Sequence, residues 1–126
     1  NILWFLFISK PLLIGRILNT ETIFVERVNN NFQIRRGFEI NRNHKILVVE
    51  DVITTGKSSL ECSSLAEKCG AEVIGFASLI DRTGGKSEIN KKIVSQIKLD
   101  ISTFTADNIP ENLKKLKAIK PGSRNL

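Results

Sequence analysis

One short run of the sequence, residues 46–58, constrains the fold and function of this chain more than any other. It reads ILVVEDVITTGKS. The four apolar residues at its start predict a short buried strand, and the Ser-, Leu-, Glu- and Ala-rich stretch that follows predicts a helix. Two carboxylates, three hydroxyl side chains and one glycine lie between these two elements. We therefore expect a strand-to-helix turn that is rich in polar groups.

The expected turn has the features of an anion-binding loop. Gly56 permits the backbone to approach a ligand closely, and the first N–H groups of a helix are unpaired and lie at the positive end of its dipole. Thr54, Thr55 and Ser58 add hydroxyl donors. An ATP-type P-loop would require glycine where this chain has Asp51, so that alternative fails. The sequence predicts a phosphate-binding loop of another kind.

Two carboxylates, Glu50 and Asp51, precede this loop directly. Carboxylates suit sugar hydroxyls or a hydrated divalent metal ion. A phosphorylated ribose carries a phosphate at one end and a diol at the other, so it matches both halves of the segment. The alternative interpretation is an ordinary turn before a capped helix, and the acidic pair makes that alternative the less favoured one.

The same run resembles the fingerprint of the type I phosphoribosyltransferases, enzymes that use 5-phosphoribosyl 1-diphosphate. The resemblance implies that Glu50 and Asp51 contact the ribose hydroxyls and that the following loop wraps the 5-phosphate. It also implies Mg²⁺ as a cofactor, with no protein residue assigned as a direct metal ligand. The binding segment so defined comprises Glu50, Asp51, Val52, Ile53, Thr54, Thr55, Gly56, Lys57 and Ser58.

A second strand and its following loop complete the predicted site. Residues 46–49, 58–69 and 73–80 predict a βαβ unit with parallel strands and a right-handed crossover. Ligands of such sheets bind beyond the carboxyl ends of the strands, so Arg82 should emerge on the same rim as the phosphate loop. Its guanidinium could bind a ligand carboxylate in a bidentate pair, or it could form a salt bridge with Asp81. Position alone does not decide between these two roles.

The sequence Leu-Ile-Asp-Arg followed by a glycine-rich turn resembles the orotate phosphoribosyltransferases, and the resemblance extends over residues 22–126. It assigns Arg82 and Thr54 to an orotate site. The implied reaction is transfer of the 5-phosphoribosyl group to orotate, which gives orotidine 5′-monophosphate and diphosphate for pyrimidine biosynthesis. Two alternatives stay open: another nucleobase phosphoribosyltransferase, and a non-catalytic regulator that senses 5-phosphoribosyl 1-diphosphate.

Residues 22–40 predict a β-hairpin that turns at three consecutive asparagines. Its cations Arg27, Arg35 and Arg36 are candidates for diphosphate contacts, and a solvated hairpin is the alternative for each of them. Many members of the resembled family carry a mobile loop with a catalytic lysine in this region. Since this chain has the hairpin instead, we assign no residue as general acid or base.

The N-terminal segment departs from the family pattern. Residues 2–8 predict a buried strand and residues 12–18 a helix, and the apolar stretch is far shorter than the roughly 20 residues that span a bilayer. Residues 1–21 match the family poorly. We therefore expect an α/β fold with a type I phosphoribosyltransferase-like parallel sheet, flanked by helices and incomplete at the N-terminus. Residues 1–126 would form a single partial phosphoribosyltransferase domain, which need not have enzymatic activity by itself.

Composition narrows the range of partners. The net charge is +6, but the basic residues are spread along the chain, and the lysine-rich run near residues 113–120 predicts the solvated face of a short amphipathic helix. We therefore predict small-molecule substrates, with neither nucleic acid nor a membrane as partner. Cys62 and Cys69 lie too far apart on the expected helix for a disulfide, which predicts a reducing, cytoplasmic compartment. The family resemblance implies a homodimer.

Overall fold

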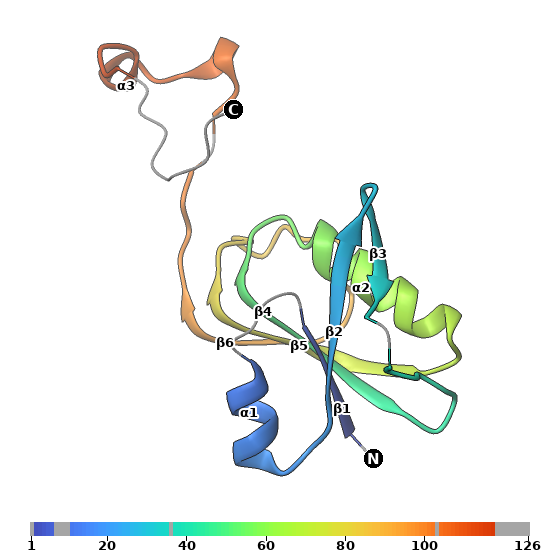
Figure 1. Ribbon diagram of the computed structural model, residues 1–126. Coiled ribbons are helices and arrows are strands. Elements are labelled where there is room, and N and C mark those ends of the chain that lie inside the picture. Colours follow the sequence, from blue (N-terminus) through green and yellow to red (C-terminus); the bar gives the residue numbers. More distant parts are fainter. Residues whose placement is uncertain (1, 7–10, 36, 103, 118–126) are drawn as a thin grey trace.

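The computed structural model describes residues 2–6, 11–35, 37–102 and 104–117. Its centre is a six-stranded sheet with the strand order β3-β2-β1-β4-β5-β6 (Figure 1). The strands are β1 Ile2–Leu6, β2 Thr22–Val28, β3 Asn31–Ile34, β4 Lys45–Ile53, β5 Glu72–Asp81 and β6 Ile93–Lys98. The helices are α1 Pro11–Leu18, α2 Lys57–Lys68 and α3 Glu111–Lys114, with a 3₁₀ turn at Ala106–Asn108.

The strand pairing confirms the predicted parallel βαβ unit. β4 pairs in parallel with β5 on one side and with β1 on the other, and β5 pairs in parallel with β6. β2 is parallel to β1 and forms an antiparallel hairpin with β3. Asn29 and Asn30 have φ of 49° and 63°, which gives the tight turn that matches the twist of the two strands.

The order of the strands reverses direction between β1 and β4. The chain passes from β1 outward to β2 on one side of the sheet and from β4 outward to β5 on the other. In open α/β sheets, the crevice beyond the carboxyl ends of the strands at such a reversal is where ligands bind. The turn that follows β4 lies at this point, so the topology itself directs the predicted phosphate loop toward a binding crevice.

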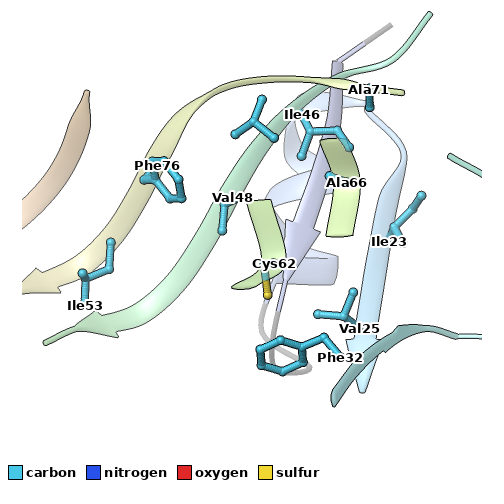
Figure 2. Close-up of a cluster of buried hydrophobic side chains, with 11 residues drawn as sticks. Ile23, Val25, Phe32, Ile46, Val48, Ile53, Cys62, Ala66, Ala71 and Phe76 are labelled. Carbon is cyan, nitrogen blue, oxygen red and sulfur yellow. The ribbon is translucent and has the colours of Figure 1, made fainter. Parts of the chain in front are cut away.

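The core lies between α2 and the sheet. Cys62 and Ala66, one helical turn apart, are buried in this layer, and the strands contribute apolar side chains from the other side. Figure 2 shows the resulting cluster. Its buried members are Ile23, Val25, Phe32, Ile46, Val48, Ile53, Cys62, Ala66, Ala71, Val73 and Phe76. This packing fixes the direction of the helix and therefore the place of its N-terminal turn.

Several predicted boundaries differ from the observed ones. The strand predicted at residues 46–49 continues to Ile53, because β4 stays paired with β5 along its whole length. The second hairpin strand ends at Ile34 rather than near residue 40, and β6 was not predicted at all. Cys69 is only half-buried, in contrast to Cys62.

The predicted amphipathic helix near the C-terminus is shorter than expected. α3 has four residues, and Leu113 and Leu116 are 37% and 67% exposed. The remainder of that prediction, from residue 118 onward, lies outside the described residues, as does residue 8 of the predicted N-terminal strand. Among the described residues, no helix has the length and apolar character needed to cross a membrane.

Among the residues whose burial the structure describes, Phe76 is the largest fully buried side chain, with 1% of its surface exposed. We expect Phe76→Ala to lower the free energy of unfolding by about 3–5 kcal/mol, because it removes buried apolar surface and leaves a cavity. Leu79→Ala on the same strand, where the side chain is 53% exposed, should change it by less than about 1 kcal/mol. Urea unfolding followed by circular dichroism measures both values, and equal losses would contradict the placement of the core.

Candidate active site

The turn between β4 and α2 adopts the conformation of an anion-binding loop. Gly56 precedes the helix with φ 82° and ψ 0°, a left-handed conformation that favours glycine. The Lys57 N–H donates to Thr55 Oγ1 at 3.3 Å, and the Leu60 N–H donates to the Gly56 carbonyl at 2.9 Å. Gly56, the N-cap residue of α2, makes no side-chain capping hydrogen bond. The first N–H groups of this twelve-residue helix therefore point toward the turn with the positive end of the helix dipole behind them.

Gly56 is also required for space. A Cβ atom at this position would lie 2.8 Å from Cδ1 of Ile89, closer than side chains pack in proteins. Ile89 belongs to the loop between β5 and β6 and packs against the core. The phosphate loop and the glycine-rich loop after β5 are therefore in direct contact, and the absence of a side chain at residue 56 makes that contact possible.

The loop after β5 is held by hydrogen bonds around Asp81. The Thr83 N–H donates to Asp81 Oδ1 at 2.9 Å, and the Gly85 N–H donates to Thr83 Oγ1 at 3.1 Å. The backbone hydrogen bond from Thr83 is the main reason that the pKa of Asp81 lies below its ordinary value. The Arg82 N–H donates to the Ile53 carbonyl at 2.8 Å and so ties this loop to the end of β4.

An open cleft of about 900 Å³ lies between these two loops and the segment that follows β6. It brings together Thr54, Thr55, Lys57 and Arg82, as the sequence predicted for the rim of a parallel sheet. The other residues that line it are Thr83, Gly84, Lys86, Glu88, Asp100, Ile101, Ser102, Phe104 and Asn108. Lys86, in the turn after β5, was not predicted as part of the site. The segment after β6 was not predicted either, because its position depends on β6, which carried no clear sequence pattern.

Arg82 is half-buried in this cleft. It forms no ion pair with Asp81 or with any other carboxylate among the described residues. Its buried Nε has no hydrogen-bond partner there. A guanidinium without a counter-charge retains its donors for a ligand, and a carboxylate fits its planar fork.

The acidic pair was predicted to lie in the turn after the strand, and this position was wrong. Both residues lie within β4, which continues to Ile53. Glu50 and Asp51 belong to β4, and their side chains leave opposite faces of the sheet because successive strand residues alternate. Asp51 is exposed, whereas Glu50 is half-buried and accepts a hydrogen bond from Ser59 Oγ at 2.6 Å. Neither residue lines the cleft; both precede it along the strand that leads to Thr54.

Burial is the main reason that the pKa of Glu50 is raised above its ordinary value. The Ser59 hydrogen bond lowers this pKa, and the charge of Asp51 raises it further. Ser59 was not predicted as a site residue, although a signal was present. Ser59, Cys62, Ser63 and Ala66 follow the spacing of one helical face, so Ser59 had to point toward the sheet.

The two hairpin arginines that the structure describes, Arg27 and Arg35, do not line the cleft. Arg27 pairs with Glu61 of α2 at 2.6 Å and stacks over the ring of Phe32 at 4.0 Å. Arg35 lies 3.5 Å from Glu26 on the exposed hairpin. Arg36 is outside the described residues. Among the described residues, no group of three or more His, Cys, Asp or Glu side chains forms a metal cluster.

The structure is an open α/β domain in which the loops after β4 and β5 line one cleft at the carboxyl ends of these strands. Comparison with known families agrees, because the model of the phosphoribosyl transferase domain matches residues 17–113. The chain belongs to this family.

Several orotate phosphoribosyltransferases share much of this sequence. An orotate phosphoribosyltransferase of Maricaulis maris is 41% identical over 112 residues, and one of Methylobacterium sp. is 44% identical over 111 residues. These alignments cover 89% and 87% of this chain but only 58% and 57% of the relatives. The chain thus spans little more than half the length of the relatives it matches.

Solved structures of the family share the fold. An adenine phosphoribosyltransferase of Thermoanaerobacter pseudethanolicus superimposes with a TM-score of 0.66 at 15% identity, covering 79% of this chain and 70% of that one. The Mycobacterium tuberculosis orotate phosphoribosyltransferase in complex with 5-phospho-alpha-D-ribosyl 1-diphosphate superimposes with a TM-score of 0.58 at 25% identity. This match covers 78% of this chain and 62% of that one. The predicted fold class is therefore confirmed.

Gly56→Ala tests the backbone of the phosphate loop. We expect it to lower the free energy of unfolding by more than about 2 kcal/mol, because a side chain in a left-handed conformation costs about 1–2 kcal/mol and the new methyl group would also meet Ile89. Gly37→Ala is the matched control, since Gly37 has φ 92° and open space around it. Chemical unfolding should show the smaller loss for Gly37→Ala; the reverse order would argue against the contact with Ile89.

Glu50→Gln tests the burial of the acidic pair. Because the folded-state pKa of Glu50 is raised, the native protein binds this proton more tightly than the unfolded chain, and stability falls as the pH rises through the folded-state pKa. We therefore expect Glu50→Gln to be the more stable protein at about pH 7, with the advantage shrinking toward about pH 4. Urea unfolding at both pH values measures this difference, with Glu39→Gln, on an exposed loop, as the control. A pH-independent difference would contradict the burial effect.

Proposed function

We propose that this chain forms the ribose-phosphate-binding part of an orotate phosphoribosyltransferase. The reaction would transfer the 5-phosphoribosyl group of 5-phosphoribosyl 1-diphosphate to orotate, giving orotidine 5′-monophosphate and diphosphate. The names of the relatives support this assignment, and the chain covers more than half of their length.

One observation carries the proposal: the phosphate loop and the unpaired Arg82 face the same cleft. Thr54, Thr55, Lys57 and Arg82 all line it, and Arg82 forms no ion pair with a carboxylate in the described part of the chain. A ligand with a phosphate at one end and a carboxylate at the other would satisfy both. Orotidine 5′-monophosphate has both groups, whereas the uridine and adenosine monophosphates have only the phosphate.

The proposed roles follow from this arrangement. The helix N-terminus and the hydroxyl groups of Thr54, Thr55 and Ser58 bind the 5-phosphate. Glu50 and Asp51 do not line the cleft itself; they lie on the strand that leads into the loop, and they would accept hydrogen bonds from ribose hydroxyls that extend from the bound phosphate toward β4. Arg82 and Thr54 hold the base. Together these contacts fix ribose C1 against the attacking ring nitrogen, so that positioning supplies part of the catalysis.

Magnesium would enter this site with the diphosphate. Mg²⁺ keeps several water ligands and usually takes one or two carboxylates plus substrate phosphates, rather than a full protein cage. Asp51 is an exposed carboxylate on the strand before the loop, so its oxygens fit such a partial role. When bound, the ion would neutralise charge on the leaving diphosphate. Lys57, at the cleft, is better placed to assist there than Arg27 or Arg35, whose carboxylate partners lie outside the cleft.

We also propose a cytoplasmic homodimer for the intact protein. The free thiols of Cys62 and Cys69 fit a reducing compartment, and the family resemblance supports the dimer. Light scattering of the purified protein tests the dimer, since a monomeric mass at every concentration would refute it.

Calorimetric titration with orotidine, uridine and adenosine monophosphates tests the function. We expect orotidine monophosphate to bind about tenfold or more tightly than the other two, because a charge-assisted bidentate pair forms with Arg82. Arg82→Ala should remove this preference and leave phosphate affinity nearly unchanged. Arg35→Ala, which alters an exposed cation away from the cleft, is the matched control.

The outcomes separate the candidate functions. Equal binding of all three nucleotides by the wild-type protein would leave a general ribose-phosphate site and refute the orotate assignment. A preference that survives in Arg82→Ala would remove Arg82 from the base site. Circular dichroism of each variant shows whether a loss of binding reflects a loss of folding.

A further inference from the structure

The contact between Glu50 and Ser59 joins the strand before the phosphate loop to the helix after it. Ser59 Oγ lies 2.6 Å from Glu50 Oε1, and the two residues are nine positions apart in the sequence. A hydroxyl that donates to a carboxylate at this distance forms a charge-assisted hydrogen bond, which is shorter and stronger than one between neutral groups. The bond thus bridges the two elements that enclose the loop.

Ser59 is almost completely shielded from solvent, with 1% of its surface exposed. Water therefore cannot replace its hydroxyl, and a buried carboxylate that loses its donor keeps the full cost of desolvation. Ser59 also opposes the rise in the pKa of Glu50 that burial and the charge of Asp51 produce. The Cys62 thiol, also on α2, experiences the charge of Glu50. Burial is the main cause that raises the pKa of this thiol to about 12 and so keeps it protonated.

A second hydroxyl group lies on the strand next to Glu50. Ser78 on β5 is in register with Glu50, so both side chains leave the same face of the sheet. Ser78 is 6% exposed, and its Oγ has no hydrogen-bond partner in the part of the chain that the structure describes. Without Ser59, the Glu50 carboxylate could turn along the sheet toward Ser78. The Ser59 bond therefore selects one orientation of the carboxylate out of two.

We propose that Ser59 is a positioning residue that holds the Glu50 carboxylate in the orientation that accepts the ribose hydroxyls. This inference rests on the proposed function, because it assigns a role to Ser59 within the same ribose-phosphate site. Ser59 does not touch the substrate. It acts through Glu50, and its effect is therefore confined to the sugar and does not extend to the phosphate.

Isothermal calorimetry with ribose 5-phosphate and with inorganic phosphate separates these two effects. We expect Ser59→Ala to weaken ribose 5-phosphate binding about five- to tenfold and to leave phosphate binding within about twofold, since one hydrogen bond to a charged group is lost. Ser59→Thr keeps the hydroxyl and should restore most of the affinity for ribose 5-phosphate. Ser63→Ala is the matched control, because Ser63 is buried on the same face of α2 one turn later and has no bond to Glu50.

Each result decides one question. A wild-type protein that binds ribose 5-phosphate no better than phosphate would refute the proposed function, and the inference with it. If the wild-type protein prefers ribose 5-phosphate, the function stands. Ser59→Ala then overturns the positioning role if it weakens both ligands equally, leaves both unchanged, or behaves like Ser63→Ala. If Ser59→Ala does not fold, the wild-type protein is compared with Ser59→Thr and with Ser78→Ala instead. Both variants keep the hydroxyl group at residue 59, so a retained preference for ribose 5-phosphate over phosphate supports the positioning role of Ser59. Loss of that preference refutes the role.

Discussion

The packing of α2 against β4 and β5 is the constraint on which the rest of this structure depends. Cys62 and Ala66 can be buried against Val48 and Phe76 only when the helix lies along this part of the sheet. That placement brings the N-terminal turn of α2 to the carboxyl end of β4, where the strand order reverses. The direction of the helix dipole toward the cleft is therefore a consequence of core packing, and Gly56 provides the sharp turn that the packing requires.

Some polar residues near the cleft stabilise the folded state, and others lower its stability. Asp81 is satisfied by the backbone of its own loop, which stabilises its ionised form. Glu50 is desolvated beside another carboxylate, and Arg82 has a buried nitrogen without a partner in the described structure. Groups placed at such cost near the carboxyl ends of two neighbouring strands are typical of binding sites, where a ligand supplies the missing partner.

The sequence predicted the centre of the fold well and its edges less well. The run from β4 through α2 to β5 combines an apolar strand, a helical face and a glycine turn, so three independent signals agree. The end of β4 was placed too early because Glu50 and Asp51 look like loop residues, whereas pairing with β5 keeps them in the strand. β6 was missed because Val94 and Ile97 are about half exposed, which leaves an edge strand without a clear alternation.

The sequence by itself determined which residue types the candidate site contains: a loop rich in hydroxyl groups and glycine, an acidic pair before it and an arginine after the next strand. The order of these residues along the chain indicates the kind of site, since few other structures require hydroxyl groups, glycine and carboxylates at this spacing. Only the tertiary structure decided which groups meet. It left Arg82 without an ion pair to Asp81, a choice that the sequence had left open, and it paired Arg27 with Glu61 of α2. It also placed Ser59 against Glu50, because contacts between distant residues depend on how helix and sheet pack and not on local sequence.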